Sequence, residues 1–177
     1  PFDMSDLDVA EALLCNAEVM RYVADVMTPE QVGAHMSNLT RRGAGGRIGI
    51  WCAERKDTGE KIGDGALAPI PIEETKTPWH QLVPDAYPTN RLQVGYLLVP
   101  SAWGQGFASE ICHRLLRFAF EMTALDEVVA CTDFDNAASQ RVLKKSGVRD
   151  CGPGFAFGED VAWFEITRSE WGVLSTC

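Results

Sequence analysis

The stretch that decides the fold is Leu92-Gln93-Val94-Gly95-Tyr96-Leu97-Leu98-Val99-Pro100-Ser101-Ala102-Trp103-Gly104-Gln105-Gly106-Phe107-Ala108. Its first half is typical of a strand that ends at Pro100, and its second half is a glycine-containing turn that opens a helix. A helix N-terminus presents unpaired N–H groups and a partial positive charge, and glycines let a ligand approach the backbone closely. The turn therefore suits a phosphate or pyrophosphate, the alternative being a tight turn without a ligand.

The chain after this turn alternates helices and strands. A helix is expected over residues 107–122, because one apolar stripe runs along it, made of Ala108, Ile111, Cys112, Leu115, Leu116 and Ala119. An apolar strand is expected over 127–132, then a short helix that Asn136 begins and Gly147 ends, and a last strand over 161–167. Neither Gly-Lys-Ser/Thr nor Gly-x-Gly-x-x-Gly occurs at the turn, so a P-loop nucleotide triphosphatase is not supported.

The chain before the deciding strand reads as two helices and a hairpin. Ser5 and Thr28 are expected to cap the two helices. Strands over 48–54 and 61–70, joined by a short turn, form the hairpin. Five prolines between residues 69 and 88 then mark a long irregular loop, and loops of that length are usually functional or mobile. The expected fold is therefore mixed α/β.

The composition limits the classes of protein. The 177 residues include 16 basic and 25 acidic side chains, for a net charge of −9, and 46% of the residues are hydrophobic. One packed domain is expected, and no apolar run is long enough to span a bilayer. The acidic balance argues against nucleic-acid binding and mildly favours a cationic partner. Six cysteines without a CxxC pair and three distant histidines indicate reduced thiols, a cytoplasmic location and no metal site.

Three ordered motifs carry a resemblance to a known family. They are Gly95-Tyr96-Leu97-Leu98, then Pro-x-x-Trp-Gly-x-Gly-x-Ala-x-Glu from Pro100 to Glu110, and Asn-x-x-Ser-x-Arg-Val-Leu-x-Lys-x-Gly from Asn136 to Gly147. The chain resembles the Gcn5-related N-acetyltransferase (GNAT) superfamily, and within it the branch of ribosomal-protein N-terminal acetyltransferases. The match is strong over residues 93–147 and looser elsewhere.

This resemblance implies a single domain over residues 1–177, with a central, mostly antiparallel, twisted sheet whose middle strands splay apart and are flanked by helices. Its first strand would be cut short, because the chain starts at Pro1. The implied ligand is acetyl-coenzyme A, in a V-shaped gap between strands 92–99 and 127–132. No metal is implied.

The resemblance also implies which residues bind the cofactor: Leu97, Leu98, Val99, Trp103, Gly104, Gln105, Gly106, Phe107, Ala108, Asn136, Ser139, Arg141 and Lys145. The backbone of residues 97–99 would pair with the pantetheine arm, and the amides of residues 104–108 would hold the pyrophosphate. Asn136 would hydrogen-bond the arm, although Asn is also a good helix cap. Arg141 or Lys145 would meet the 3′-phosphate.

The implied reaction moves an acetyl group to a primary amine by direct attack in a ternary complex. Ser139 would give a proton to the leaving thiolate, the alternative being a merely solvated hydroxyl. Glu73 and Glu74, in the proline-rich loop, would attract an ammonium group or act as a base through water, or would be simply solvated charges. Gln93 stands where many branch members carry Glu, and an amide cannot serve as a base.

The acceptor is expected to be a peptide or protein α-amino group, or a small cationic amine such as an aminoglycoside-type antibiotic. Neither a nucleic acid nor a membrane is expected as a partner, and the chain would be a monomer or a homodimer. The competing class is a non-catalytic acyl-coenzyme A-binding sensor or scaffold module.

Overall fold

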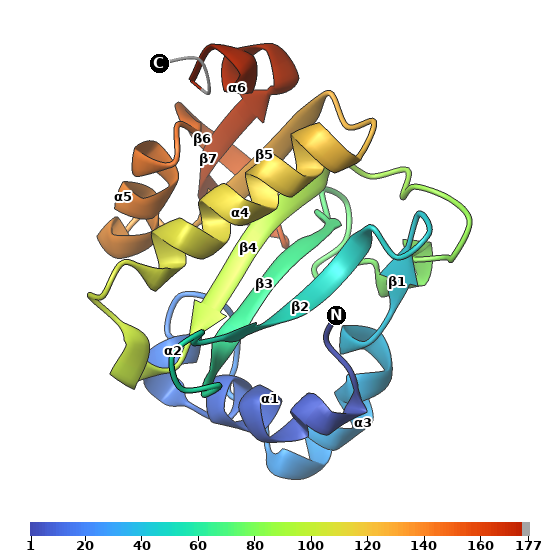
Figure 1. Cartoon of the computed structure of the whole chain (residues 1–177), viewed down its shortest axis with the longest axis vertical. Coiled ribbons are helices and arrows are strands. Elements are labelled where there is room, and N and C mark those ends of the chain that lie inside the picture. Colours follow the sequence, from blue (N-terminus) through green and yellow to red (C-terminus); the bar gives the residue numbers. More distant parts are fainter. Residues whose placement is uncertain (175–177) are drawn as a thin grey trace.

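A seven-stranded sheet in the order β1-β2-β3-β4-β5-β7-β6 is the centre of the computed structural model, which describes residues 1–174 (Figure 1). The strands are β1 (Arg42–Gly43), β2 (Ile48–Glu54), β3 (Lys61–Pro69), β4 (Leu92–Leu98), β5 (Glu127–Thr132), β6 (Arg149–Ala156) and β7 (Glu159–Thr167). The α-helices are α1 (Leu7–Leu14), α2 (Ala17–Met20), α3 (Pro29–Leu39), α4 (Phe107–Met122), α5 (Ala137–Lys145) and α6 (Arg168–Leu174). The pair β4–β5 is parallel and the other neighbouring pairs are antiparallel, so the predicted fold class is confirmed.

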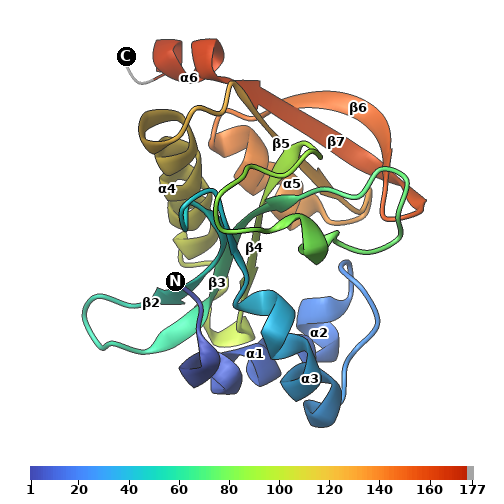
Figure 2. The same ribbon diagram turned by 90° about the vertical axis from the view of Figure 1, so that its right-hand side faces the viewer.

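Helices cover both faces of the sheet. Figure 2 shows α4 on one face of β2–β4 and helices α1–α3 on the other. The apolar stripe of α4 is buried as predicted, with Cys112, Leu116 and Ala119 completely inaccessible to solvent. The helix packs so closely that a Cβ at Gly65 of β3 would lie 2.6 Å from the side chain of Ile111. Glycine at this position therefore lets α4 approach the sheet.

Strands β4 and β5 meet at one end and diverge at the other. Along β4, pairing with β3 continues from Leu92 to Leu98. Pairing of β4 with β5 is confined to one position, Gln93 opposite Val129. Because the two strands are parallel and their N-terminal ends are paired, their C-terminal ends are separated. The predicted V-shaped gap between these strands is therefore present.

The helix starts show where local patterns succeed and fail. Thr28 caps α3 in the predicted capping box, accepting from the Gln31 N–H while the Gln31 side chain accepts from the Thr28 N–H. The predicted start at Ser5 is wrong. Asp3 caps the first turn instead, in a capping box with Asp6, and a short 3₁₀ turn precedes α1. Each of the two aspartate side chains accepts a hydrogen bond from a backbone N–H at the other position, as Ser and Glu do in the common capping box.

The strand pattern missed β6 and the two-residue β1. β6 contains Gly152, Pro153 and Gly154, which are depleted in strands, and it lies at the edge of the sheet. It pairs only with β7, across a bulge between Asp150 and Pro153. Tertiary pairing therefore creates this strand against its local preference. In the part of the chain that the structure describes, no helix has the length and apolar character to cross a membrane.

Candidate active site

The edge of β4 that faces the gap carries backbone groups without a strand partner. The Val99 N–H donates to a β3 carbonyl at 3.0 Å, so the amide of Val99 points toward β3. Because amide direction alternates along a strand, the amides of Tyr96 and Leu98 point the other way, toward the gap. The Leu98 carbonyl on that side accepts a hydrogen bond from Trp103 Nε1 at 2.8 Å. The Leu98 N–H is left facing the open gap.

The turn after β4 presents a row of free amides beside the gap. Gly104 has a φ of 72° and Gly106 a φ of 91°, backbone conformations that favour glycine. Gly106 is the N-cap of α4, and no side chain caps this helix. Among the described residues, no acceptor takes a hydrogen bond from the N–H groups of residues 104–108. The positive end of α4 is therefore available to an anion.

A pair of hydroxyls joins β4 to α5. The Tyr96 and Ser139 hydroxyls lie 3.1 Å apart, and the Tyr96 hydroxyl also donates to the Ser139 carbonyl at 3.3 Å. Burial raises the pKa of Tyr96, so its phenol stays protonated. No pattern along the chain connects Tyr96 with Ser139, because the two residues are 43 positions apart.

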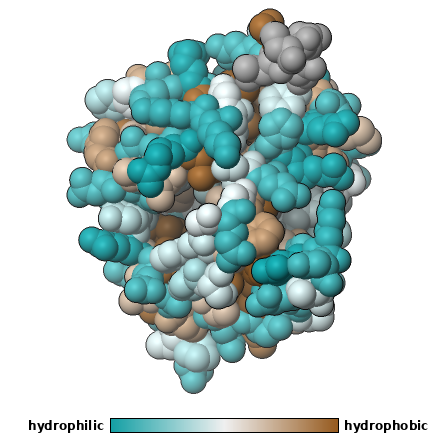
Figure 3. All heavy atoms as spheres, turned by 60° about the vertical axis from the view of Figure 1, so that its left-hand side comes forward, coloured by the Kyte–Doolittle hydropathy of each residue, from teal (hydrophilic) through white to brown (hydrophobic). Residues whose placement is uncertain are grey.

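Helix α5 presents the other predicted cofactor residues. Asn136 Oδ1 accepts from the Ser139 N–H at 3.1 Å, so Asn136 is a helix cap, as its residue type alone predicted. Its amide nitrogen has no partner among the described residues. Arg141 and Lys145 are exposed and form no ion pair with described residues, whereas the neighbouring Lys144 pairs with β6. On the side of the molecule where α5 lies, most of the surface is hydrophilic and apolar residues show in its hollows (Figure 3).

The proline-rich loop reaches the turn between β6 and β7. The Phe157 N–H donates to the Pro71 carbonyl at 3.2 Å, and that turn lies at the open end of the gap. Glu73 and Glu74 are exposed and make neither a hydrogen bond nor an ion pair with described residues. Trp79 anchors the loop, since its ring packs edge-on against a histidine of α3. The structure thus places both glutamates in the loop beside the turn and not on the floor of the gap.

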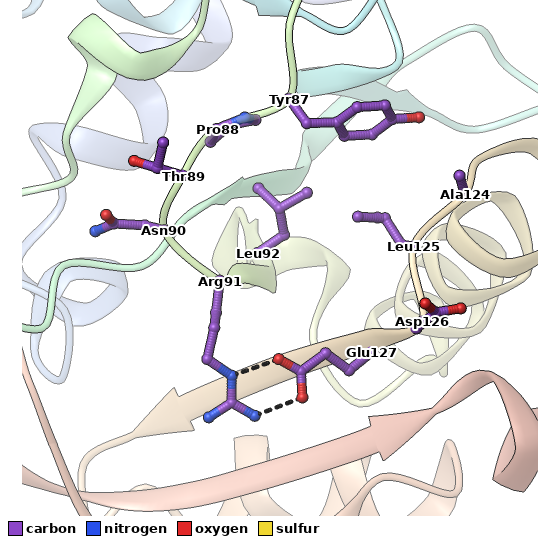
Figure 4. Close-up of a pocket in the computed structure, with 10 residues that line it drawn as sticks. All are labelled: Tyr87, Pro88, Thr89, Asn90, Arg91, Leu92, Ala124, Leu125, Asp126 and Glu127. Atoms are coloured by element: carbon purple, nitrogen blue, oxygen red, sulfur yellow. Dashed lines mark hydrogen bonds and ion pairs between the residues drawn. The ribbon is translucent and has the colours of Figure 1, made fainter.

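Two hollows lie apart from the gap. One, of about 300 Å³, lies at the paired end of β4 and β5, between residues 87–92 and 124–127 (Figure 4). There Arg91 forms a bidentate ion pair with Glu127, at 2.7 and 2.9 Å, and a further contact with Glu165 at 2.7 Å. This network ties the loop to β5 and β7. The other, of about 630 Å³, is a groove between β2 and α4. Of the residues predicted to bind the cofactor, only Phe107 lines this groove.

A family model matches most of the chain that forms this gap. The model of the acetyltransferase (GNAT) domain matches residues 1–149. The chain belongs to the GNAT acetyltransferase family. It is a GNAT N-acetyltransferase domain, of the class that uses acetyl-coenzyme A.

Relatives of this GNAT domain include FsC-acetyl coenzyme A-N(2)-transacetylase of Aspergillus fumigatus, which is 33% identical over 123 residues, 64% of this chain and 48% of that protein. YkkB of Bacillus subtilis is 30% identical over 148 residues, 82% of this chain and 78% of that protein. The chain thus spans about half the length of the fungal relative and three quarters of the bacterial one. The structure of aminoglycoside acetyltransferase AAC(6′)-Ib with coenzyme A superposes with a TM-score of 0.75 at 15% identity, over 98% of this chain and 96% of that one, and so shares the fold.

Proposed function

We propose that the chain transfers the acetyl group of acetyl-coenzyme A to a primary amine by direct attack in a ternary complex. The observation that carries this proposal is the row of free amides at residues 104–108 beside the open edge of β4. An anion-binding turn next to an unpaired strand edge suits a ligand with a pyrophosphate at one end and an extended, amide-containing arm.

In this proposal each part of the cofactor is bound by a different group of residues. The amides of residues 104–108 hold the pyrophosphate, and the backbone of residues 97–99 pairs with the pantetheine arm as an added strand would. The free amide nitrogen of Asn136 donates to the arm. The exposed cations Arg141 and Lys145 meet the 3′-phosphate, since neither is neutralised by a described residue.

The chemistry needs alignment, charge stabilisation and proton transfer. A neutral amine attacks the thioester carbonyl, and the negative charge that develops on its oxygen requires a hydrogen-bond donor. The Leu98 N–H points into the gap and serves as that donor, a role typically worth about 3 kcal/mol. The thiolate leaves with a proton from Ser139, whose hydroxyl is oriented by Tyr96 at 3.1 Å.

For the acceptor, we propose a peptide or protein α-amino group, in line with the resemblance to the ribosomal-protein branch, or a small cationic amine. Exposed Glu73 and Glu74, beside the β6–β7 turn, would attract the ammonium form of either. A panel of Ala-starting peptides, polyamines and aminoglycosides, assayed for release of coenzyme A, tests this. Tight binding of acetyl-coenzyme A without acetylation of any amine would favour the non-catalytic binding module.

Replacement of Ser139 by Ala tests the leaving-group step. Turnover is expected to fall by about 100-fold, because the thiolate loses its proton donor, while the affinity for acetyl-coenzyme A changes less than about twofold. Steady-state kinetics and calorimetry measure the two quantities. Tyr96→Phe, which leaves the serine hydroxyl in place, should have a smaller effect. Unchanged turnover in Ser139→Ala would remove Ser139 from the mechanism.

Shortening the loop between Glu73 and Pro88 tests the acceptor side. The Michaelis constant for the amine is expected to rise about tenfold, since one glutamate and the segment beside the β6–β7 turn are lost, while affinity for acetyl-coenzyme A stays within about twofold. Equal losses for both substrates would mean that the loop only supports the fold. Thermal unfolding of the shortened chain distinguishes that case from global destabilisation.

A further inference from the structure

Asp64 is a carboxylate in the interior of β3 that the mechanism above does not use. It lies between Cys52 of β2 and Leu97 of β4, and it accepts the Leu97 N–H at 3.2 Å. No cation of the described residues forms an ion pair with it. A partly buried carboxylate without a counter-ion costs stability, and such groups gather at functional sites.

Asp64 lies on β3, next to the strand β4 that borders the gap, and the pairing of these two strands gives the face on which its side chain lies. Residues directly opposite each other in neighbouring strands have side chains on the same face. Asp64 therefore shares a face with Leu97 and, two residues along each strand, with Ala66 and Gly95. Leu97 and Ala66 pack against the cluster formed with α1 and α3, which identifies this face as the one opposite α4.

Open space lies beside Asp64 on that face. No heavy atom lies within 4 Å of the point that a Cβ of Gly95 would occupy. Gly95 is two residues beyond Gln93, where β5 has already separated from β4. The open position over Gly95 therefore adjoins the region where β4 and β5 separate, and it lies one strand away from Asp64.

We propose that Asp64 is the general base of this site, taking a proton from the ammonium form of an acceptor amine that lies over Gly95. The inference rests on the proposed function. The ammonium group gives one proton to the carboxylate, directly or through one water, and the freed lone pair forms the C–N bond with the thioester carbonyl carbon. The C–S bond then breaks and the thiolate takes the Ser139 proton. The second amine proton restores the Ser139 hydroxyl, and the proton on Asp64 leaves to solvent.

The charges around Asp64 suit this role. Burial raises its pKa to about 7, partly offset by the hydrogen bond from β4, which matches a base that acts near neutral pH. On β2, burial and Asp6 raise the pKa of Cys52 to about 12, so that thiol stays neutral. Asp6 itself pairs with Lys61 at 3.0 Å, so this lysine is not a counter-ion for Asp64. Cys15, at the end of α1, packs against the cluster on this face, and β4 contributes no titratable side chain to it.

The test compares wild type with Asp64→Asn, which keeps the shape and the acceptor for the Leu97 N–H. The probes are an Ala-starting peptide and kanamycin, each with acetyl-coenzyme A, between about pH 6 and pH 9. Near neutral pH, kcat/KM for the variant is expected to be about 100-fold lower, and the deficit should shrink as pH rises because the free amine forms without a base. Affinity for acetyl-coenzyme A should change less than about twofold. Asp8→Asn, on the exposed side of α1, is the matched control and should leave the rate unchanged.

Thermal unfolding shows that Asp64→Asn is folded and reports the burial of the carboxylate. The native chain holds the Asp64 proton up to about pH 7, whereas the unfolded chain loses it near the ordinary value of 3.8. The native state thus binds more protons between these values, and wild-type stability falls as pH rises through them. The variant is therefore expected to melt roughly 5 °C higher than wild type at pH 8, with the difference vanishing near pH 4.

The outcomes separate the two proposals. Wild type that acetylates either probe, with Asp64→Asn within about threefold and an unchanged pH profile, would overturn the base and leave the proposed function intact. Wild type that binds acetyl-coenzyme A but acetylates neither probe would overturn both the proposed acceptor and the base.

Discussion

Gly106→Glu is expected to lower the affinity for acetyl-coenzyme A by at least about 100-fold. Gly106 caps α4 with a φ of 91°, and the space around it is open, with no heavy atom within 4 Å of a Cβ position. In the proposal that space holds the pyrophosphate, so the substitution adds a side chain and a negative charge to the phosphate site. Calorimetric titration with coenzyme A measures the effect.

Gly152→Glu is the matched control for this variant. Gly152 has a φ of 81°, and it too has no heavy atom within 4 Å of a Cβ position, but it lies in β6, away from the turn. Both substitutions impose the same left-handed backbone strain, about 1 kcal/mol, on a residue with room for the side chain. Only the variant at residue 106 should lose affinity. Micromolar binding retained by Gly106→Glu would place the pyrophosphate elsewhere.

Leu98→Pro is expected to reduce turnover by about 100- to 1,000-fold, because it removes the N–H that the proposal assigns to the developing oxyanion. The Leu98 amide points toward the gap, so its loss breaks no hydrogen bond to β3, and proline is tolerated at such strand positions. Single-turnover rates at saturating acetyl-coenzyme A isolate the chemical step from binding.

Leu98→Ala controls for the loss of packing. Leu98 is 6% exposed, and truncation of its side chain costs about 2–5 kcal/mol of stability in either variant. The alanine variant keeps the N–H and should keep turnover within about tenfold at a temperature where both variants are folded. Equal turnover in the two variants would mean that another group stabilises the oxyanion.

Elements with strong local periodicity were predictable from the sequence. Four features were predicted correctly: the apolar stripe of α4, the strands β2 and β5, and the cap at Thr28. Each of them depends only on residues that are close together in the sequence. β6 was not predictable in this way, because its glycines and proline oppose a strand and only pairing with β7 creates it. The start of α1 failed because Asp3 competes with Ser5 for the same cap.

For the site, the sequence alone located the turn and the α5 segment but not the contacts between distant strands. The hydrogen bond between Tyr96 and Ser139 spans 43 residues, and no local pattern connects the two. Asp64 was overlooked because a single acid in a hairpin strand reads as a solvent-facing residue, and its burial appears only when α1–α3 cover that face. The one signal available in the sequence was the alternation along β3, which places Asp64 on the same face of the strand as Ala66.

In the proposed function, the amides of residues 104–108 and the open edge of β4 hold acetyl-coenzyme A. Titration of ¹⁵N-labelled protein with coenzyme A, followed through the backbone amide signals, tests this placement. The largest shifts are expected on residues 104–108 and on Tyr96 and Leu98. Shifts confined to the groove between β2 and α4, or to residues 87–92, with the amides of residues 104–108 unmoved, would contradict it.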